Sequence, residues 1–292
     1  MRGPFRQAIA VRDQDGKIVL KTEELHFIKD RYPILGWPLI RGVVNFGGSM
    51  VAGVKALMYS ASFYPEEEEA QPSKFEQWLG RHISSEKLES LVIYLAVLMG
   101  ILFSVGLFML LPTFLVGLVR PIHDNYLLRN LCEGLVKIVI FTGYMAAISK
   151  LPDMRRVFSY HGAEHKTIKC YEMGLPLTVE NVRPCTRFHP RCGTSFLFVV
   201  IIISILVGSV IQVGNTLLRM LCHLLLLFPV VAISYEFNRL VGRYDNAFTR
   251  ALTAPGMWFQ KFTTNEPDDS MIQCAIAAME EVIPEQEGAD DW

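Results

Sequence analysis

Residues 91–119 decide the class of the fold: they read LVIYLAVLMGILFSVGLFMLLPTFLVGLV and contain no charged side chain. A helix of about 20 apolar residues crosses the hydrocarbon core of a bilayer, which is about 30 Å thick. A second uncharged run covers residues 195–213, and two more stretches, 131–149 and 217–237, are mostly apolar. The sequence therefore predicts an all-α polytopic membrane protein with about four transmembrane helices.

The distribution of Lys and Arg predicts the orientation of these helices. The loop 150–194, between the second and third spans, is rich in both residues, as are the flanks 81–87 and 239–250. Cytoplasmic loops of membrane proteins carry this excess, so we expect both termini and the loop 150–194 in the cytoplasm. A net charge of −1 and the lack of a basic tract argue against nucleic acid as a partner, which leaves the lipid bilayer.

The remaining segments predict smaller elements around the membrane region. Alternating apolar residues on both sides of Asp15-Gly16 are typical of a β-hairpin. The glycine-rich, apolar stretch 35–62 carries charges that make it a poor span, so we expect an interfacial or re-entrant helix, or a buried helix covering a site. The chain then divides into a hairpin region, this helix, an acidic linker, the transmembrane region and a C-terminal segment with a docked amphipathic helix: 1–34, 35–62, 63–90, 91–237 and 238–292.

The loop 150–194 contains the motif His161-Gly162-Ala163-Glu164-His165. Residues four apart share a helical face, and Glu164 falls on the same face as the two histidines. Two imidazoles and a carboxylate are the minimum set for a hydrolytic metal site, and His-x-x-Glu-His is the inverzincin order. We expect a divalent metal, best matched by zinc, on His161 and His165. Glu164 would act as general base or complete the ligand set. The small Gly162 and Ala163 would let another segment pack close.

Zinc needs more than two protein ligands, and four further residues are candidates. Three lie in the same loop and one at the cytoplasmic end of the fourth span: Cys185, His189, Cys192 and Glu236. The spacing of the two cysteines and the histidine is not that of a zinc finger, and the sequence leaves the choice open.

Three cations near the motif would suit an anionic substrate. Lys166, Arg187 and Arg191 could recognise phosphate or carboxylate groups. Cytoplasmic loops require Lys and Arg whatever they bind, so the positive-inside rule is the alternative explanation of these residues.

The order of these motifs resembles a bacterial membrane family, domain of unknown function 1385, labelled as predicted metal-dependent enzymes. The matching segments are spread over nearly the whole chain: Met1–Pro4, Ala8–Arg12, Gly53–Leu57, Tyr160–Lys166, Arg183–Thr194 and Glu266–Asp269. The resemblance implies a multi-pass protein of the bacterial plasma (inner) membrane. Members usually carry a glycine-rich stretch before Met1–Pro4, so we expect this N-terminus to lack part of the family pattern.

Together these features predict a metal-dependent hydrolase acting at the cytosolic membrane surface on a lipid-linked phosphate or ester, or on a peptide. The alternative is a non-enzymatic membrane scaffold, assembly factor or transporter with a structural metal. A histidine-rich patch that binds no metal is the third reading. The number of protein ligands separates the first two, because catalytic zinc keeps an open position and structural zinc has four protein ligands. The sequence assigns no oligomeric state.

Overall fold

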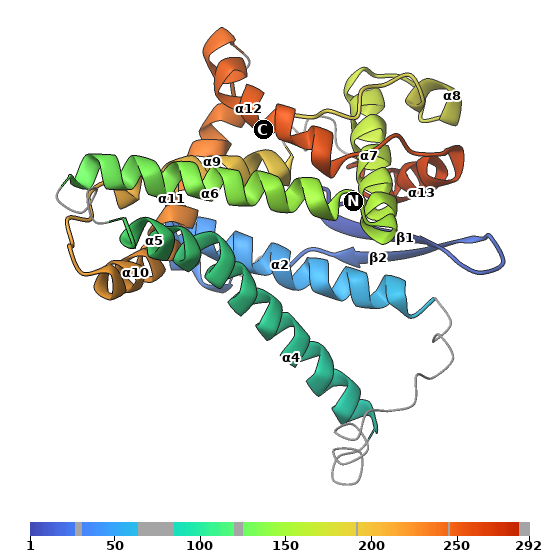
Figure 1. Cartoon of the computed structure of the whole chain (residues 1–292). Coiled ribbons are helices and arrows are strands. Elements are labelled where there is room, and N and C mark those ends of the chain that lie inside the picture. Colours follow the sequence, from blue (N-terminus) through green and yellow to red (C-terminus); the bar gives the residue numbers. More distant parts are fainter. Residues whose placement is uncertain (27–30, 64–84, 120–124, 191, 245, 286–292) are drawn as a thin grey trace.

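The computed structural model describes residues 1–26, 31–63, 85–119, 125–190, 192–244 and 246–285. The acidic part of the predicted linker, 64–84, lies outside these ranges. Over these ranges the protein is mostly helical, with one two-stranded sheet (Figure 1). Its elements are β1 Arg6–Arg12, β2 Ile18–Glu24, η1 Pro33–Gly36, α2 Ile40–Ala61, α4 Ser85–Val105, η2 Gly106–Leu110, α5 Leu111–Gly117, α6 Tyr126–Ile148, α7 Pro152–Glu172, α8 Val179–Val182, α9 Gly193–Gly208, α10 Thr216–Leu225, α11 Leu227–Gly242, α12 Ala247–Thr263 and α13 Asp269–Glu280.

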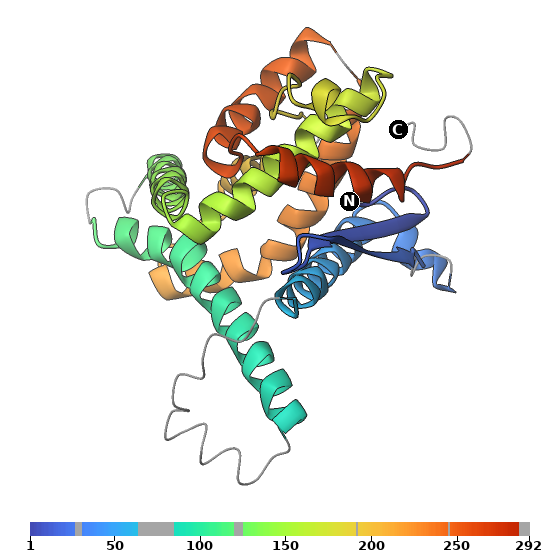
Figure 2. The ribbon, with the colours of Figure 1, turned by 90° about the vertical axis from the view of Figure 1, so that its right-hand side faces the viewer.

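The predicted N-terminal hairpin is confirmed. Strands β1 and β2 pair antiparallel, with Val11 opposite Val19. Gly16 has φ of 80°, a backbone conformation that glycine adopts without steric cost. Helix α13 lies between the hairpin and α7, as Figure 2 shows, and buries Ile272, Ala275 and Ala278 there. The C-terminal segment thus docks through an amphipathic helix, as expected.

The expectation of four transmembrane helices is met only in part. In the part of the chain that the structure describes, two helices are long and apolar enough to cross a membrane, Tyr94–Gly117 and Tyr126–Ile148. The stretch 217–237 forms two helices, α10 and α11, which meet at 45° and count as a third span only if taken together. The stretch 195–213 gives a shorter apolar helix, Phe196–Gly208.

Backbone chemistry explains where the apolar stretches bend. Pro229 has no N–H and its ring clashes with the carbonyl four residues earlier, so a straight helix cannot run from α10 into α11. Pro112 likewise lacks an N–H inside the first span, but it does not divide that span. There the chain stays helical through the π-helical turn η2, and Thr113 donates a hydrogen bond to the carbonyl of Met109 at 3.3 Å.

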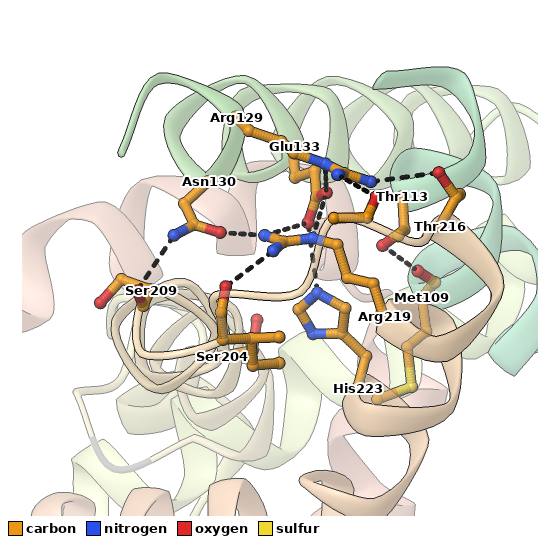
Figure 3. A network of polar contacts seen from close by, with 12 residues as sticks. Met109, Thr113, Arg129, Asn130, Glu133, Ser204, Ser209, Thr216, Arg219 and His223 are labelled. Carbon is orange, nitrogen blue, oxygen red and sulfur yellow. Dashed lines mark hydrogen bonds and ion pairs between the residues drawn. The ribbon is translucent and has the colours of Figure 1, made fainter. Parts of the chain in front are cut away.

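The non-helical segment 209–215, between α9 and α10, is tied down by buried polar side chains (Figure 3). Three of its carbonyls accept hydrogen bonds: Ser209 from Asn130 (3.1 Å), Ile211 from Arg219 (2.8 Å) and Gly214 from Arg129 (3.1 Å). Irregular backbone among apolar helices is tolerated only when its polar groups are satisfied within the protein. These side chains therefore stabilise the break that shortens the third predicted span.

Glu133 is the carboxylate at the centre of this network. Glu133 could pair along α6 with Lys137, one turn later. Instead it accepts a hydrogen bond from Arg219 Nε at 2.7 Å, and His223 Nε2 lies 3.2 Å away. Arg129 Nε is also within 3.3 Å, and both arginines are fully buried. The pairing crosses from α6 to α10 because two buried guanidinium groups require a countercharge.

Replacing this carboxylate should destabilise the protein strongly. Glu133→Gln leaves two buried guanidinium groups without an anion, which should cost about 3 kcal/mol or more. Thermal unfolding in detergent measures the loss. The control is Glu23→Gln, because Glu23 pairs with Lys21 at the surface and should contribute less than about 1 kcal/mol. Equal melting temperatures for the two variants would contradict the role of the network.

Candidate functional site

Three of the predicted ligands converge. His161 and His165 lie one turn apart on α7, with ring centroids 4.4 Å apart. Cys192, just before α9, places its Sγ 3.2 Å from His161 Nε2. One potential ligand atom from each residue lies within 4.8 Å of the corresponding atoms of the other two. Among the described residues, this is the one group of three or more side chains that could hold a metal ion together. We call His161, His165 and Cys192 the triad.

The orientation of both imidazoles suits a metal site. His161 Nδ1 donates to the carbonyl of Thr263 at 2.8 Å, and His165 Nδ1 donates to the carbonyl of Arg187 at 2.6 Å. A carbonyl can only accept, so each Nδ1 carries a proton, and whenever the ring is neutral its Nε2 keeps a lone pair for a metal. Metal-binding histidines are held in this way by a backbone or carboxylate acceptor.

The residues of the triad also shift one another's pKa values. Burial raises the pKa of the Cys192 thiol, but hydrogen bonds and charge from His161 and His165 outweigh it and lower the pKa to about 5. Burial lowers the pKa of His161, but Cys192 and the carbonyl of Thr263 raise it to about 9. Without a metal, the triad at neutral pH therefore holds a thiolate beside an imidazolium. A thiolate is the form of cysteine that binds metals.

Glu164 is on α7 but not in the triad. Its carboxylate lies 3.6 Å from the α-amino group of Met1, and its side chain is 42% exposed. In this conformation it is not a third ligand. Its charge still helps to raise the pKa of His161, so it lies within electrostatic reach of the triad. Its role as a general base stays a prediction.

The other three candidate ligands have different partners. Cys185 packs in a core cluster and donates to the carbonyl of Asn181 at 3.3 Å. His189 Nε2 lies 3.0 Å from Glu172, although its ring is near that of His165. Glu236, on α11, accepts hydrogen bonds from the Arg41 side chain and from the N–H of Leu39. Among the described residues, Cys192 is the one of these four candidates that lies in a group with both histidines.

A segment that the sequence reasoning missed completes the site. Residues 263–266, which we call the strap, run along α7. Thr263 holds His161, and the N–H of Asn265 donates to the carbonyl of Phe158 at 2.9 Å. A Cβ on Gly162 would lie 2.1 Å from the carbonyl oxygen of Asn265, so this position requires glycine. The glycine inside the motif was the available signal, and the expected close packing is confirmed.

Two of the three predicted substrate-binding cations lie beside the strap. Lys166 is buried, and its Nζ lies 2.9 Å from the Arg183 carbonyl and 2.9 Å from the Glu266 carboxylate. Arg187 Nη1 donates to the carbonyl of Thr264 at 2.6 Å, and its Nε lies 3.6 Å from Glu266. Arg191 lies outside the described residues.

Comparison with known proteins gives two matches. A family described as "Protein of unknown function (DUF1385)" matches residues 37–285. The chain is 34% identical over 290 residues to "Uncharacterized protein YqhQ" of Bacillus subtilis (strain 168), with 96% of this chain and 88% of that protein covered. No solved structure matches the chain.

Filling the space at Gly162 should displace the strap. Gly162→Ala forces the Asn265 carbonyl away from α7 and should cost about 1–3 kcal/mol. Thermal unfolding measures this loss. In the control Gly53→Ala, the added methyl group meets nothing within 4 Å on helix α2, so stability should stay the same or rise by up to about 1 kcal/mol. A Gly162 variant as stable as the control would contradict the contact.

The thiolate of Cys192 should be visible in metal-free protein. The ultraviolet absorbance of thiolates, measured as wild type minus Cys192→Ser, should be lost as the pH falls through about 5. His161→Ala should move this midpoint upward, because it removes the imidazolium that stabilises the thiolate. A wild-type midpoint near the ordinary thiol value of 9.0 would show that the triad is not assembled.

Proposed function

From the premise that this chain belongs to the DUF1385 family, we propose that it is a metal-dependent membrane hydrolase acting at the cytosolic membrane surface. The observation that carries the proposal is the triad, in which three suitable donor atoms of His161, His165 and Cys192 lie within 4.8 Å of one another. Imidazole and thiolate are ligands that suit zinc.

The number of ligands favours an enzyme over a scaffold. Zinc sites with three protein ligands keep a position for water or substrate, whereas structural sites use four. Cys185 and His189 would be the natural fourth ligands of a structural site, but both contact other groups. The scaffold, assembly factor or transporter remains the rival proposal, and it requires one of these side chains to turn toward the triad.

At such a site, residues of the chain would orient the metal ligands and accept a proton. Zinc supplies Lewis acidity and can bring the pKa of a water ligand to about 7. The carbonyls of Thr263 and Arg187 keep both imidazoles in the tautomer that leaves Nε2 available. Glu164, next to His165 and half-exposed, would take the proton from the attacking water after leaving its ion pair with Met1.

We further propose four membrane crossings with the triad on the cytoplasmic side. The crossings are α4–α5, α6, α9 and α10–α11. The hydrogen-bonded segment 209–215 would complete the crossing that α9 is too short to make, since its carbonyls are satisfied inside the protein. Helix α2 would lie at the membrane surface, because Met50, Val51 and Leu57 are exposed and, of its residues, Gly42 alone is buried.

Metal content of detergent-purified protein tests the site. Wild type should contain about one zinc ion per chain after purification without chelator. His161→Ala, His165→Ala and Cys192→Ser should each lose it, because two ligands rarely hold zinc. Cys185→Ser is the matched control from the same loop and should keep the metal. Retention by Cys192→Ser, or loss with Cys185→Ser, would contradict the assignment.

Glu164→Gln separates a base from a ligand. The variant should keep its zinc but lose hydrolysis of any p-nitrophenyl phosphate or ester that the wild type cleaves only when zinc is bound. Loss of zinc would make Glu164 a ligand, and unchanged hydrolysis would exclude it as the base.

A further inference from the structure

Two cationic side chains that lie beside the strap contact the same carboxylate, that of Glu266. Lys166 Nζ lies 2.9 Å from Glu266 Oε2, and Arg187 Nε lies 3.6 Å from Glu266 Oε1. Each cation faces a different oxygen of the same carboxylate. We call Lys166 and Arg187 the anion clamp, and Glu266 is its occupant.

The burial of the three side chains is unequal. The Lys166 side chain is 7% exposed and that of Arg187 is 22% exposed, whereas Glu266 is 68% exposed. An ion pair with a mostly exposed carboxylate contributes little to stability, because solvent screens it. A buried ammonium nevertheless requires an anion. The cations are therefore fixed in the protein, while their partner is held loosely and faces solvent.

Other contacts keep the clamp in place independently of Glu266. The carbonyl of Arg183 accepts from Lys166 Nζ at 2.9 Å, and that of Thr264 accepts from Arg187 Nη1 at 2.6 Å. The guanidinium of Arg187 also lies over the ring of Phe188, 5.0 Å from its centroid. Departure of the carboxylate would leave two preorganised cations, which is the arrangement that binds an incoming anion well.

The clamp shares its backbone with the triad. Lys166 follows His165 on α7, and the carbonyl of Arg187 is the acceptor that orients His165. Thr264, which holds the Arg187 side chain, follows Thr263, which holds His161. An anion in the clamp would therefore be presented on the scaffold that holds the metal ligands.

We propose that the anion clamp binds a phosphate group of the substrate and that Glu266 is a built-in competitor that occupies the clamp until the phosphate displaces it. A phosphate dianion matches two cations better than a single carboxylate charge, and its oxygens can accept from both side chains. That this phosphate belongs to a substrate rests on the proposed function. The phosphate-binding site itself can be tested without any reaction.

A second ion pair, at the start of α13, provides a matched control. Asp269 also accepts from an arginine, Arg183, at 2.6 Å, but here both side chains are exposed. Glu266→Gln and Asp269→Asn each remove one negative charge from an ion pair, at positions three residues apart in the chain. Only the first frees a pair of preorganised cations.

Calorimetric titration of zinc-loaded protein with inorganic phosphate tests the clamp. Glu266→Gln should bind phosphate at least about tenfold more tightly than wild type, because it removes the competitor and one negative charge. Asp269→Asn should bind like wild type, and adding Arg187→Gln to Glu266→Gln should abolish the gain. An equal gain in both single variants would reduce the effect to overall charge, and no gain in Glu266→Gln would overturn the proposal.

Two further arms separate the possible outcomes. Short-chain phosphatidic acid, with the matching diacylglycerol as control, shows whether a lipid phosphate is preferred to the free ion. Repeating the phosphate titration on chelator-treated protein separates the clamp from the metal, since the gain in Glu266→Gln should persist there even if the metalloenzyme proposal fails. If Glu266→Gln does not fold, the phosphate-dependent rise in melting temperature of wild type, and its loss in Arg187→Gln, decides the question.

Discussion

The close approach of the strap to α7 is the contact on which the candidate site depends. Glycine at position 162 lets the backbone of Asn265 lie against the helix, where a methyl group would collide with its carbonyl. That approach places the carbonyl of Thr263 on His161 and brings Glu266 to the clamp. The C-terminal region thus orients His161, a candidate ligand 102 residues before Thr263 in the chain.

Two polar centres are built on α6 and on the helix that follows it in the chain, α7; Figure 1 shows both helices. At the start of α6, Arg129 and Arg219 donate to the carbonyls of an irregular segment, with Glu133 between them. Around α7, backbone carbonyls accept from the histidines of the triad. Both centres follow the same rule, that a buried polar group must find its partner within the protein. In the first centre, side chains donate hydrogen bonds to backbone carbonyls that would otherwise be unsatisfied. In the second, backbone carbonyls accept hydrogen bonds from the histidine side chains and so orient them.

The sequence predicts those parts of this arrangement that depend on a local pattern, such as the helical repeat or a turn motif. The four-residue spacing placed His161 beside His165, and Asp15-Gly16 gave the hairpin. Hydropathy found the apolar stretches, but it measures composition and not backbone, so it could not show that the helix of 195–213 ends at Gly208. Cys192 could not be chosen over Cys185, because both belong to an irregular loop without a period. The partners of Glu133 and the strap depend on contacts between distant segments, which no local pattern encodes.

The most direct test of the proposed centre is X-ray absorption at the zinc edge of the purified protein. The proposal predicts one sulfur ligand at about 2.3 Å, with nitrogen or oxygen ligands at about 2.0–2.1 Å, and loss of the sulfur contribution in Cys192→Ser if any zinc remains. A shell with two sulfur ligands would mean that Cys185 joins the site and would favour a structural role. The absence of any specifically bound metal after reloading with zinc, manganese or iron would contradict the proposed metalloenzyme.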